Sequence, residues 1–216
     1  MNGMKIFWVF DVISPYAYLS LQQLSQLPTG TEVELVPVLF AGLLNHHGQK
    51  GPAEIAPKRR FTYRFVVWKA RKLGVPLKMP PAHPFNPLSA LRLVIAAGGD
   101  RRAVATAFDF VWGQGRDVSD PAVLADLARA LGIADMQAAL NDPNFKQKLR
   151  SNTEWATGRG VFGVPTFVVG DELIWGHDAF EMLVDYLRDP ALFNDEEMRR
   201  IDQLPAGATR SRVAPI

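Results

Sequence analysis

Ser14 and Pro15 are the residues whose type and position most directly suggest chemistry, because they lie between a run of β-forming residues (6–10) and a helical pattern. Serine is favoured at the N-cap of a helix, and proline at the next position, where the N–H has no intrahelical partner to lose. The N-terminus of a helix also carries free N–H groups and a partial positive charge, which stabilise an anion. Ser14 is therefore either a helix cap alone or a cap that also faces an anionic group.

The composition excludes several other kinds of chemistry. The 216 residues include no cysteine, which rules out disulfides, thiolate metal sites and a cysteine nucleophile. With four histidines and no H-E-x-x-H motif, no metal site is expected. There is no G-x-S-x-G motif and no histidine–aspartate pair close to Ser14, so a serine-hydrolase triad is not indicated.

Charge and hydropathy point to a protein of the cytoplasm. The net charge is +2, and arginine and lysine are interspersed with acids, so no nucleic-acid partner is expected. No signal-peptide core opens the chain, and no apolar run approaches the roughly 20 residues that span a bilayer. We therefore expect neither a membrane anchor nor export.

The first elements form a strand–helix–strand pattern. Residues 4–10 predict a buried strand, residues 15–27 a helix, and residues 32–38 a second strand with alternating polar and apolar positions. Strands at this spacing on either side of a helix are expected to be parallel, with a right-handed crossover.

A long helical block follows, and then β-structure returns. No strand is predicted from 41 to 159; helices are predicted at 57–73, 88–97, 101–112, 120–131, 134–140 and 142–157, with a rigid proline-rich connector at 80–87. Residues 164–169 and 172–175 predict a hairpin. Asp178 and Glu181 have the spacing of a capping box that opens a further helix, and 195–202 has the pattern of one more.

This order predicts an α/β fold: a thioredoxin-like mixed four-stranded sheet (βαβ…ββα) with a large all-helical insertion. We expect a thioredoxin-like lobe from 1–43 and 160–195, a helical insertion lobe at 44–159, and a C-terminal tail at 196–216. The sheet and the insertion are expected to be two lobes of one protein. In this topology Ser14 lies where the first strand meets the first helix.

Three separated motifs carry a resemblance to a known family. They are the segment from Phe10 to Leu19, the sequence Gly163-Val164-Pro165, and the turn Trp175-Gly176-His177-Asp178. Together with the helical insertion, they resemble the 2-hydroxychromene-2-carboxylate isomerases, which are relatives of kappa-class glutathione transferases and, more distantly, of DsbA-type thiol oxidoreductases. The resemblance implies a thioredoxin fold of the DsbA and kappa-class type, with glutathione in place of the missing cysteines.

The resemblance also implies roles for individual residues. Ser14 would donate a hydrogen bond to the glutathione sulfur, where the start of the helix lowers the thiol pKa. Val164, beside a cis Pro165, would pair its backbone with the cysteinyl part. The turn of Trp175, Gly176, His177 and Asp178 would hold the γ-glutamyl end. His177 departs from the serine of the kappa-class pattern, which puts its side-chain contact in doubt.

Further candidates would bind the glycyl end or the substrate. Gln49, where the kappa class has asparagine, and Lys58 are the nearest matches for the glycyl end. Lys58 is also a candidate for the substrate carboxylate, Asn86 for a substrate oxygen, and Arg92 is a weaker candidate. Each has a structural alternative: Lys58 a solvated lysine, Asn86 a cap for the helix starting at Pro87, Arg92 an exposed helix residue.

The activity implied by the resemblance is a glutathione-dependent cis–trans isomerisation of an aromatic 2-oxo acid, by a homodimer, in aromatic compound catabolism such as naphthalene degradation. A kappa-like transferase or peroxidase acting on other electrophiles is the alternative enzyme. A non-catalytic thioredoxin-fold binding module is the alternative of another class. A DsbA-like disulfide oxidoreductase is disfavoured, because both motif cysteines are absent.

Overall fold

The structure, a computed structural model, describes residues 5–207 and contains a four-stranded mixed sheet in the order β2-β1-β3-β4. The strands are β1 (Lys5–Phe10), β2 (Glu32–Pro37), β3 (Thr166–Val169) and β4 (Glu172–Trp175). Strand β1 is parallel to β2 and antiparallel to β3, which pairs antiparallel with β4. The predicted thioredoxin-like sheet and hairpin are thus confirmed.

Helix α1 (Pro15–Gln23) joins the two parallel strands and continues into a 3₁₀ turn, η1 (Leu24–Gln26). The described chain between β2 and β3 is free of strands, as predicted. Its elements are α2 (Phe40–His46), η2 (Pro52–Glu54), α3 (Ala56–Leu73), α4 (Leu88–Ala96), α5 (Arg101–Phe108), η3 (Asp109–Gly113), α6 (Pro121–Ala130), α7 (Met136–Asn141) and α8 (Pro143–Gly158). Helices α9 (Phe180–Arg188) and α10 (Glu196–Ile201) follow the hairpin.

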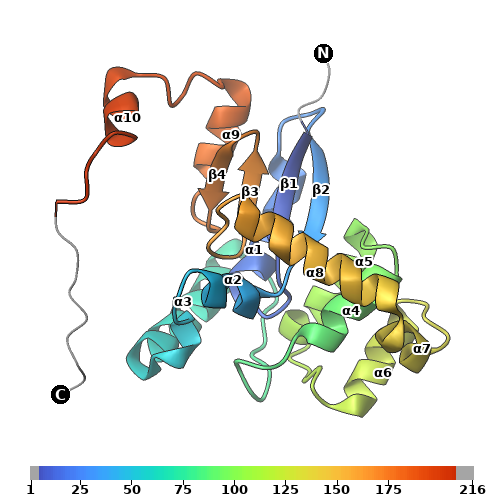
Figure 1. The fold of residues 1–216 in the computed structure, drawn as a ribbon. Helices are drawn as coiled ribbons and strands as arrows, with labels where there is room; N and C mark the ends of the chain where they lie inside the picture. Colours follow the sequence, from blue (N-terminus) through green and yellow to red (C-terminus); the bar gives the residue numbers. More distant parts are fainter. Residues whose placement is uncertain (1–4, 208–216) are drawn as a thin grey trace.

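The sheet is buried on both faces, and alternation along β1 explains why. Ile6, Trp8 and Phe10 point into a large core shared with α1 and with the helices of the insertion. Val9 points to the other face, where it packs in a smaller cluster that includes Ala156 of α8. Figure 1 shows α8 running across this face of the sheet. Because one core holds residues of both the sheet and the insertion, the helices are rigid supports for the ends of the strands.

The structure differs locally from the sequence-based expectations in three ways. Asp178 does not cap α9, which begins at Phe180 with Ala179 at the N-cap and no side-chain cap hydrogen bond. Helix α2 was not predicted, because its start depends on contacts with residues distant in sequence. Trp68 lies in the helical pattern of 57–73, where a large aromatic side chain is expected to pack in the core, yet it is 50% exposed on α3.

The C-terminal helix α10 forms as predicted, with the Asp195 side chain accepting a hydrogen bond from the N–H of Met198. Residues 208–216 of the predicted tail and Met4 of the first predicted strand lie outside the described residues. None of the helices in the described part has the length and apolar character needed to cross a membrane.

Candidate functional site

Ser14 is the N-cap of α1. Its backbone is extended (φ −90°, ψ 114°), its hydroxyl oxygen accepts a hydrogen bond from the N–H of Ala17 at 3.2 Å, and Pro15 takes the first helical position. The first N–H groups of a helix have no intrahelical partner, and only that of Ala17 is satisfied by the cap. The residue is therefore a cap, and its hydroxyl lies next to the partial positive charge at the N-terminus of α1.

The chain segment opposite Ser14 is Val164–Pro165, which immediately precedes β3 and has a cis peptide bond. The Ser14 hydroxyl donates to the carbonyl oxygen of Val164 at 3.4 Å, a long bond. The carbonyl oxygen of Pro165 accepts from the N–H of Gly176 at 2.9 Å. The first strand–helix turn, the start of β3 and the turn after β4 thus meet at one place.

The Asp11 carboxylate organises the turn that leads to Ser14. One oxygen accepts from the N–H of Ile13 at 3.0 Å and the other from the N–H of Phe40 at 2.8 Å, at the start of α2. Asp11 is fully buried, and this burial raises the pKa of its carboxyl to about 7, although the two N–H donors oppose the shift. A buried carboxyl that titrates near neutral pH therefore lies three residues before Ser14.

Two ring N–H groups from the insertion hold the same turn. The indole Nε1 of Trp112 donates to the carbonyl of Val12 at 2.8 Å, and Nε2 of His83 lies 2.9 Å from the carbonyl of Ile13. Because a carbonyl only accepts, the His83 proton is on Nε2, and Nδ1 is then an acceptor. The Tyr63 hydroxyl lies 2.7 Å from both this Nδ1 and the carbonyl oxygen of His83, so it shares its one proton between two acceptors. Burial lowers the pKa of His83, which favours this neutral form.

The turn after β4 presents three different side chains. Trp175 is 52% exposed and packs on Phe162, with ring centroids 5.1 Å apart. His177 is 4% exposed and its Nδ1 has no hydrogen-bond partner among the described residues. Burial and then the charge of Lys69 lower the pKa of His177, against the opposing effect of Asp178. An unpaired polar atom this deeply buried is unusual and is consistent with a ligand contact.

Asp178 connects this turn to α1. Its carboxylate lies so close to Gly176 that a Cβ there would be 2.6 Å from Oδ1, and Gly176 has a positive φ of 101° that suits glycine. Burial, and after it the Asp178 charge, raise the pKa of the Tyr16 phenol on the first turn of α1. The two turns therefore form adjoining walls.

The remaining predicted residues lie outside the Ser14 turn and the turn after β4. Gln49 and Lys58 are exposed, on the segment between α2 and α3 and on the first turn of α3. Asn86 is exposed, and its side-chain oxygen accepts from the N–H of Leu88 at 3.0 Å, in a turn immediately before α4. The N-cap of α4 is Pro87, so Asn86 is not the cap of a helix starting at Pro87. Its amide N–H groups stay available as donors. Arg92 lines a separate cleft between α4 and α8.

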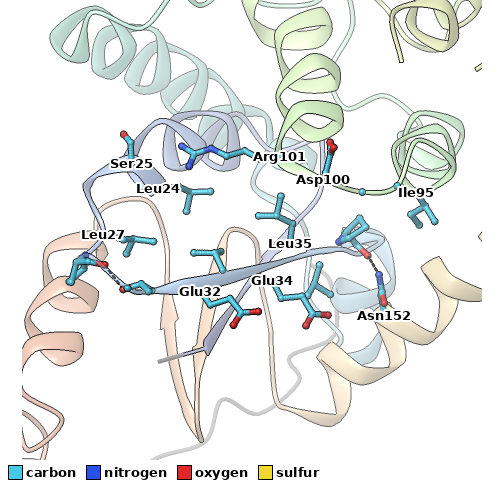
Figure 2. Close-up of a pocket in the computed structure, with 18 of the residues that line it drawn as sticks. Leu24, Ser25, Leu27, Glu32, Glu34, Leu35, Ile95, Asp100, Arg101 and Asn152 are labelled. Atoms are coloured by element: carbon cyan, nitrogen blue, oxygen red, sulfur yellow. Dashed lines mark hydrogen bonds between the residues drawn. The ribbon is translucent and has the colours of Figure 1, made fainter. Parts of the chain in front are cut away.

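A larger hollow, of about 940 Å³, runs along the outer edge of β2 and shares no residue with the Ser14 region. Figure 2 shows Leu24, Leu27 and Leu35 on one side of this strand, and Glu32 and Glu34 on the other. Within the described residues, no cluster of histidine and carboxylate side chains is arranged to hold a metal ion.

Comparison with known proteins identifies the family of this chain. The sequence profile of the DSBA-like thioredoxin domain matches residues 5–188. A 2-hydroxychromene-2-carboxylate isomerase of Sphingobium xenophagum is 31% identical over 188 residues, covering 83% of this chain and 96% of the relative. The chain belongs to the 2-hydroxychromene-2-carboxylate isomerase family, with a DSBA-like thioredoxin domain.

Two further relatives agree with the fold. Glutathione S-transferase kappa 2 of Caenorhabditis elegans is 24% identical, covering 88% of this chain and 94% of the relative. A solved structure of a 2-hydroxychromene-2-carboxylate isomerase aligns with a TM-score of 0.75 at 23% identity, over 94% of this chain and all of the other. This structural likeness shows the fold.

Asp11, His83, Tyr63 and Trp112 were not identified from the sequence as residues of the site. Asp11 could have been noticed, since it is a carboxylate inside an apolar strand–turn segment, three residues before a helix cap. The other three come from the insertion, at separations of 20 to 100 residues from their partners. Pattern alone gives no signal for these contacts.

Proposed function

We propose that this protein is a glutathione-dependent isomerase that interconverts 2-hydroxychromene-2-carboxylate and trans-o-hydroxybenzylidenepyruvate, or a related aromatic catabolite. One observation carries the proposal: the Ser14 hydroxyl, at the positive end of α1, faces the Val164 carbonyl in a chain that has no cysteine. Such a site is suited to stabilise a thiolate that the protein itself does not contain. The name of one relative supports the isomerase activity, and the name of another supports the use of glutathione.

The residues present fit glutathione. The weak 3.4 Å bond from Ser14 to Val164 can be exchanged for a charge-assisted bond to a sulfur anion. The unpaired Nδ1 of His177 and the carboxylate of Asp178 supply an acceptor and a counter-charge for the γ-glutamyl ammonium group. Val164, beside Pro165, would pair with the cysteinyl part, and Trp175 and Gly176 would complete the wall around the γ-glutamyl end. Gln49 and Lys58 are the candidates for the glycyl carboxylate.

Bound glutathione would supply a thiolate that adds reversibly to an unsaturated carbon of the substrate, so that the former double bond can rotate. The chain would hold this thiolate at the α1 N-terminus through Ser14, which donates a hydrogen bond and keeps its own proton. Lys58 would bind either the glycyl carboxylate of glutathione or, in its place, the substrate carboxylate, and the free amide of Asn86 would donate to a substrate oxygen.

A kappa-like glutathione transferase is the second candidate, favoured by the Caenorhabditis elegans relative, which covers most of both chains. The thiolate site would be the same in both enzymes. The difference would lie in which electrophile the insertion admits, because its helices form the rest of the wall.

Calorimetry and two assays test the proposal. Wild type should bind glutathione, and a hydroxychromene carboxylate should be turned over faster than a standard aryl halide. No binding of glutathione at millimolar concentration would overturn both candidates. Binding with aryl-halide turnover alone would replace the isomerase with the transferase.

A further inference from the structure

A second cleft, of about 540 Å³, opens between α4 and the N-terminal half of α8. Its walls include the apolar side chains of Leu39, Leu88 and Leu149 and the polar side chains of Arg92, Lys146 and Arg150. It contains neither Ser14 nor any residue of the Val164–Pro165 or Trp175–Asp178 segments. The cleft is therefore a different place from the proposed thiolate site.

Positive side chains outnumber negative ones in the lining of this cleft. Lys146 and Arg150 are four residues apart on α8, so they lie on the same face of the helix, and Arg92 faces them from α4. The one carboxylate in the lining is that of Glu154, which accepts from Nε of Arg150 at 2.7 Å. Two positive charges are thus left uncompensated in the cleft.

Arg92 is the residue whose surroundings are incomplete. Its Nε is shielded from solvent and has no hydrogen-bond partner, and no carboxylate among residues 5–207 forms an ion pair with it. The shielded Nε–H is costly, because this donor loses water and gains no acceptor, while the rest of the half-buried guanidinium faces the cleft without an ion-pair partner. The free energy of such a group improves when a carboxylate or similar anion binds it.

The backbone at Leu39, in the wall of the cleft, is held in place. The Thr153 hydroxyl accepts from the N–H of Leu39 at 3.0 Å and donates to the carbonyl of Leu149 at 2.8 Å, which fixes one wall of the cleft to α8. Apolar walls around a few fixed charged groups are the usual composition of a small-molecule site.

We propose that the cleft between α4 and α8 binds a small organic anion, with Arg92 contacting the anionic group, Lys146 and Arg150 adding charge, and the three leucines covering an apolar body. This site is additional to the glutathione site, and its existence does not depend on the proposed isomerase activity.

An NMR titration of the full chain with benzoate tests the proposal. Amide signals of 88–96 and 143–154 should shift, while benzyl alcohol, which has a similar shape without charge, should leave them unchanged. Arg92→Gln should weaken benzoate binding about tenfold or more, the effect of losing a hydrogen bond between two charged groups. Lys146→Gln should weaken it less.

Lys148→Gln is the matched control, because Lys148 is also on α8 but lines the hollow along β2 instead. Its benzoate affinity should equal that of wild type. Should Arg92→Gln fail to fold, Lys146→Gln against Lys148→Gln still decides the question. Equal affinity in the charge variants and wild type, or shifts concentrated around 14 and 175–178, would overturn the proposal.

The titration is repeated with saturating glutathione and in Ser14→Ala. Unchanged benzoate affinity in both supports a separate site, even if glutathione does not bind at all. Displacement of benzoate by glutathione would overturn the separate site, because the cleft would then belong to the glutathione site.

Discussion

The hydroxyl of Ser14 and the carbonyl oxygen of Val164 lie 3.4 Å apart, although 150 residues separate them in the chain. The contact joins the start of α1 to the segment before β3, so the sheet itself sets the distance between them. Because the bond is long, the hydroxyl can turn to a stronger acceptor at little cost. This contact between Ser14 and Val164 is the basis of the proposed function.

Ser14 substitutions should separate capping from thiolate stabilisation. Ser14→Ala loses both, so we expect the free energy of unfolding to fall by about 1 kcal/mol and kcat/KM by roughly 10- to 100-fold, the effect of a lost bond to a charged group. Ser14→Asp keeps a favoured cap but places a carboxylate against the thiolate. In urea, Ser14→Asp should unfold more like wild type than Ser14→Ala does. It should nevertheless lose more glutathione affinity than Ser14→Ala.

Ser20→Ala is the control for these variants, since Ser20 is buried on the same helix and its hydroxyl has no partner among the described residues. Glutathione affinity and turnover should stay at the wild-type level. If Ser14→Asp bound glutathione as tightly as Ser20→Ala, the thiolate would not be next to Ser14.

Gly163→Ala should disturb the proposed γ-glutamyl wall. A Cβ at Gly163 would be 2.5 Å from Nε1 of Trp175, so the indole ring must move. We expect glutathione to bind roughly five- to tenfold more weakly, equivalent to about one hydrogen bond, as measured by calorimetry. Gly158→Ala, on α8 with no atom within 4 Å of the new Cβ, should leave binding unchanged and stabilise the helix by up to about 1 kcal/mol. Equal glutathione affinities in the two variants would show that Trp175 does not contact glutathione.

Asp11 should make stability fall as the pH rises towards neutral. The folded pKa of about 7 lies above the ordinary value near 3.9. Between these values the folded protein keeps a proton that the unfolded chain has released, so this stabilisation is complete below about pH 4 and is lost through pH 7. In urea unfolding, the free-energy difference between wild type and Asp11→Asn should shrink by a few kcal/mol, at about 1.4 per pH unit. A constant difference from pH 4 to 7 would contradict this account of Asp11.

His83 should act on the site through the turn that it holds. His83→Ala leaves the carbonyl of Ile13 without its donor, which should lower the free energy of unfolding by about 1–3 kcal/mol and weaken glutathione binding. His83→Gln retains an N–H donor and an acceptor for Tyr63, so it should recover part of both losses. Urea unfolding and calorimetry measure the two effects. Recovery of stability without any recovery of binding would show that the turn does not position Ser14.

The sequence predicted the elements close to Ser14 well, because their signals are local. Ser14 and Pro15 mark a helix start through their own backbone preferences, and alternation in 32–38 marks β2. Helix α2 was missed because Phe40 at its start depends on Asp11, 29 residues away. Asp178 and Glu181 have capping-box spacing, yet α9 begins too late for Asp178 to cap it. Spacing identifies a possible bond, whereas the backbone between the residues decides whether it forms.

The candidate site was predictable only at the segments that the topology brings together. Ser14, Val164 and the turn after β4 follow from the strand order, since the C-terminal end of β1 adjoins the N-terminal end of the antiparallel β3. His83 and Trp112 reach the same turn from the insertion, and their positions depend on how the helices pack. Arg92, expected near the substrate, faces α8 for the same reason.

The most direct test of the central claim is the thiol pKa of bound glutathione, measured from thiolate absorbance in the ultraviolet across a pH titration. A free cysteine thiol has a pKa of about 8.5. If α1 and Ser14 hold the thiolate, the bound thiol should titrate at least about one unit lower, and Ser14→Ala should move its pKa back towards the free value. Glutathione that binds to wild type and titrates at its free value would contradict the claim.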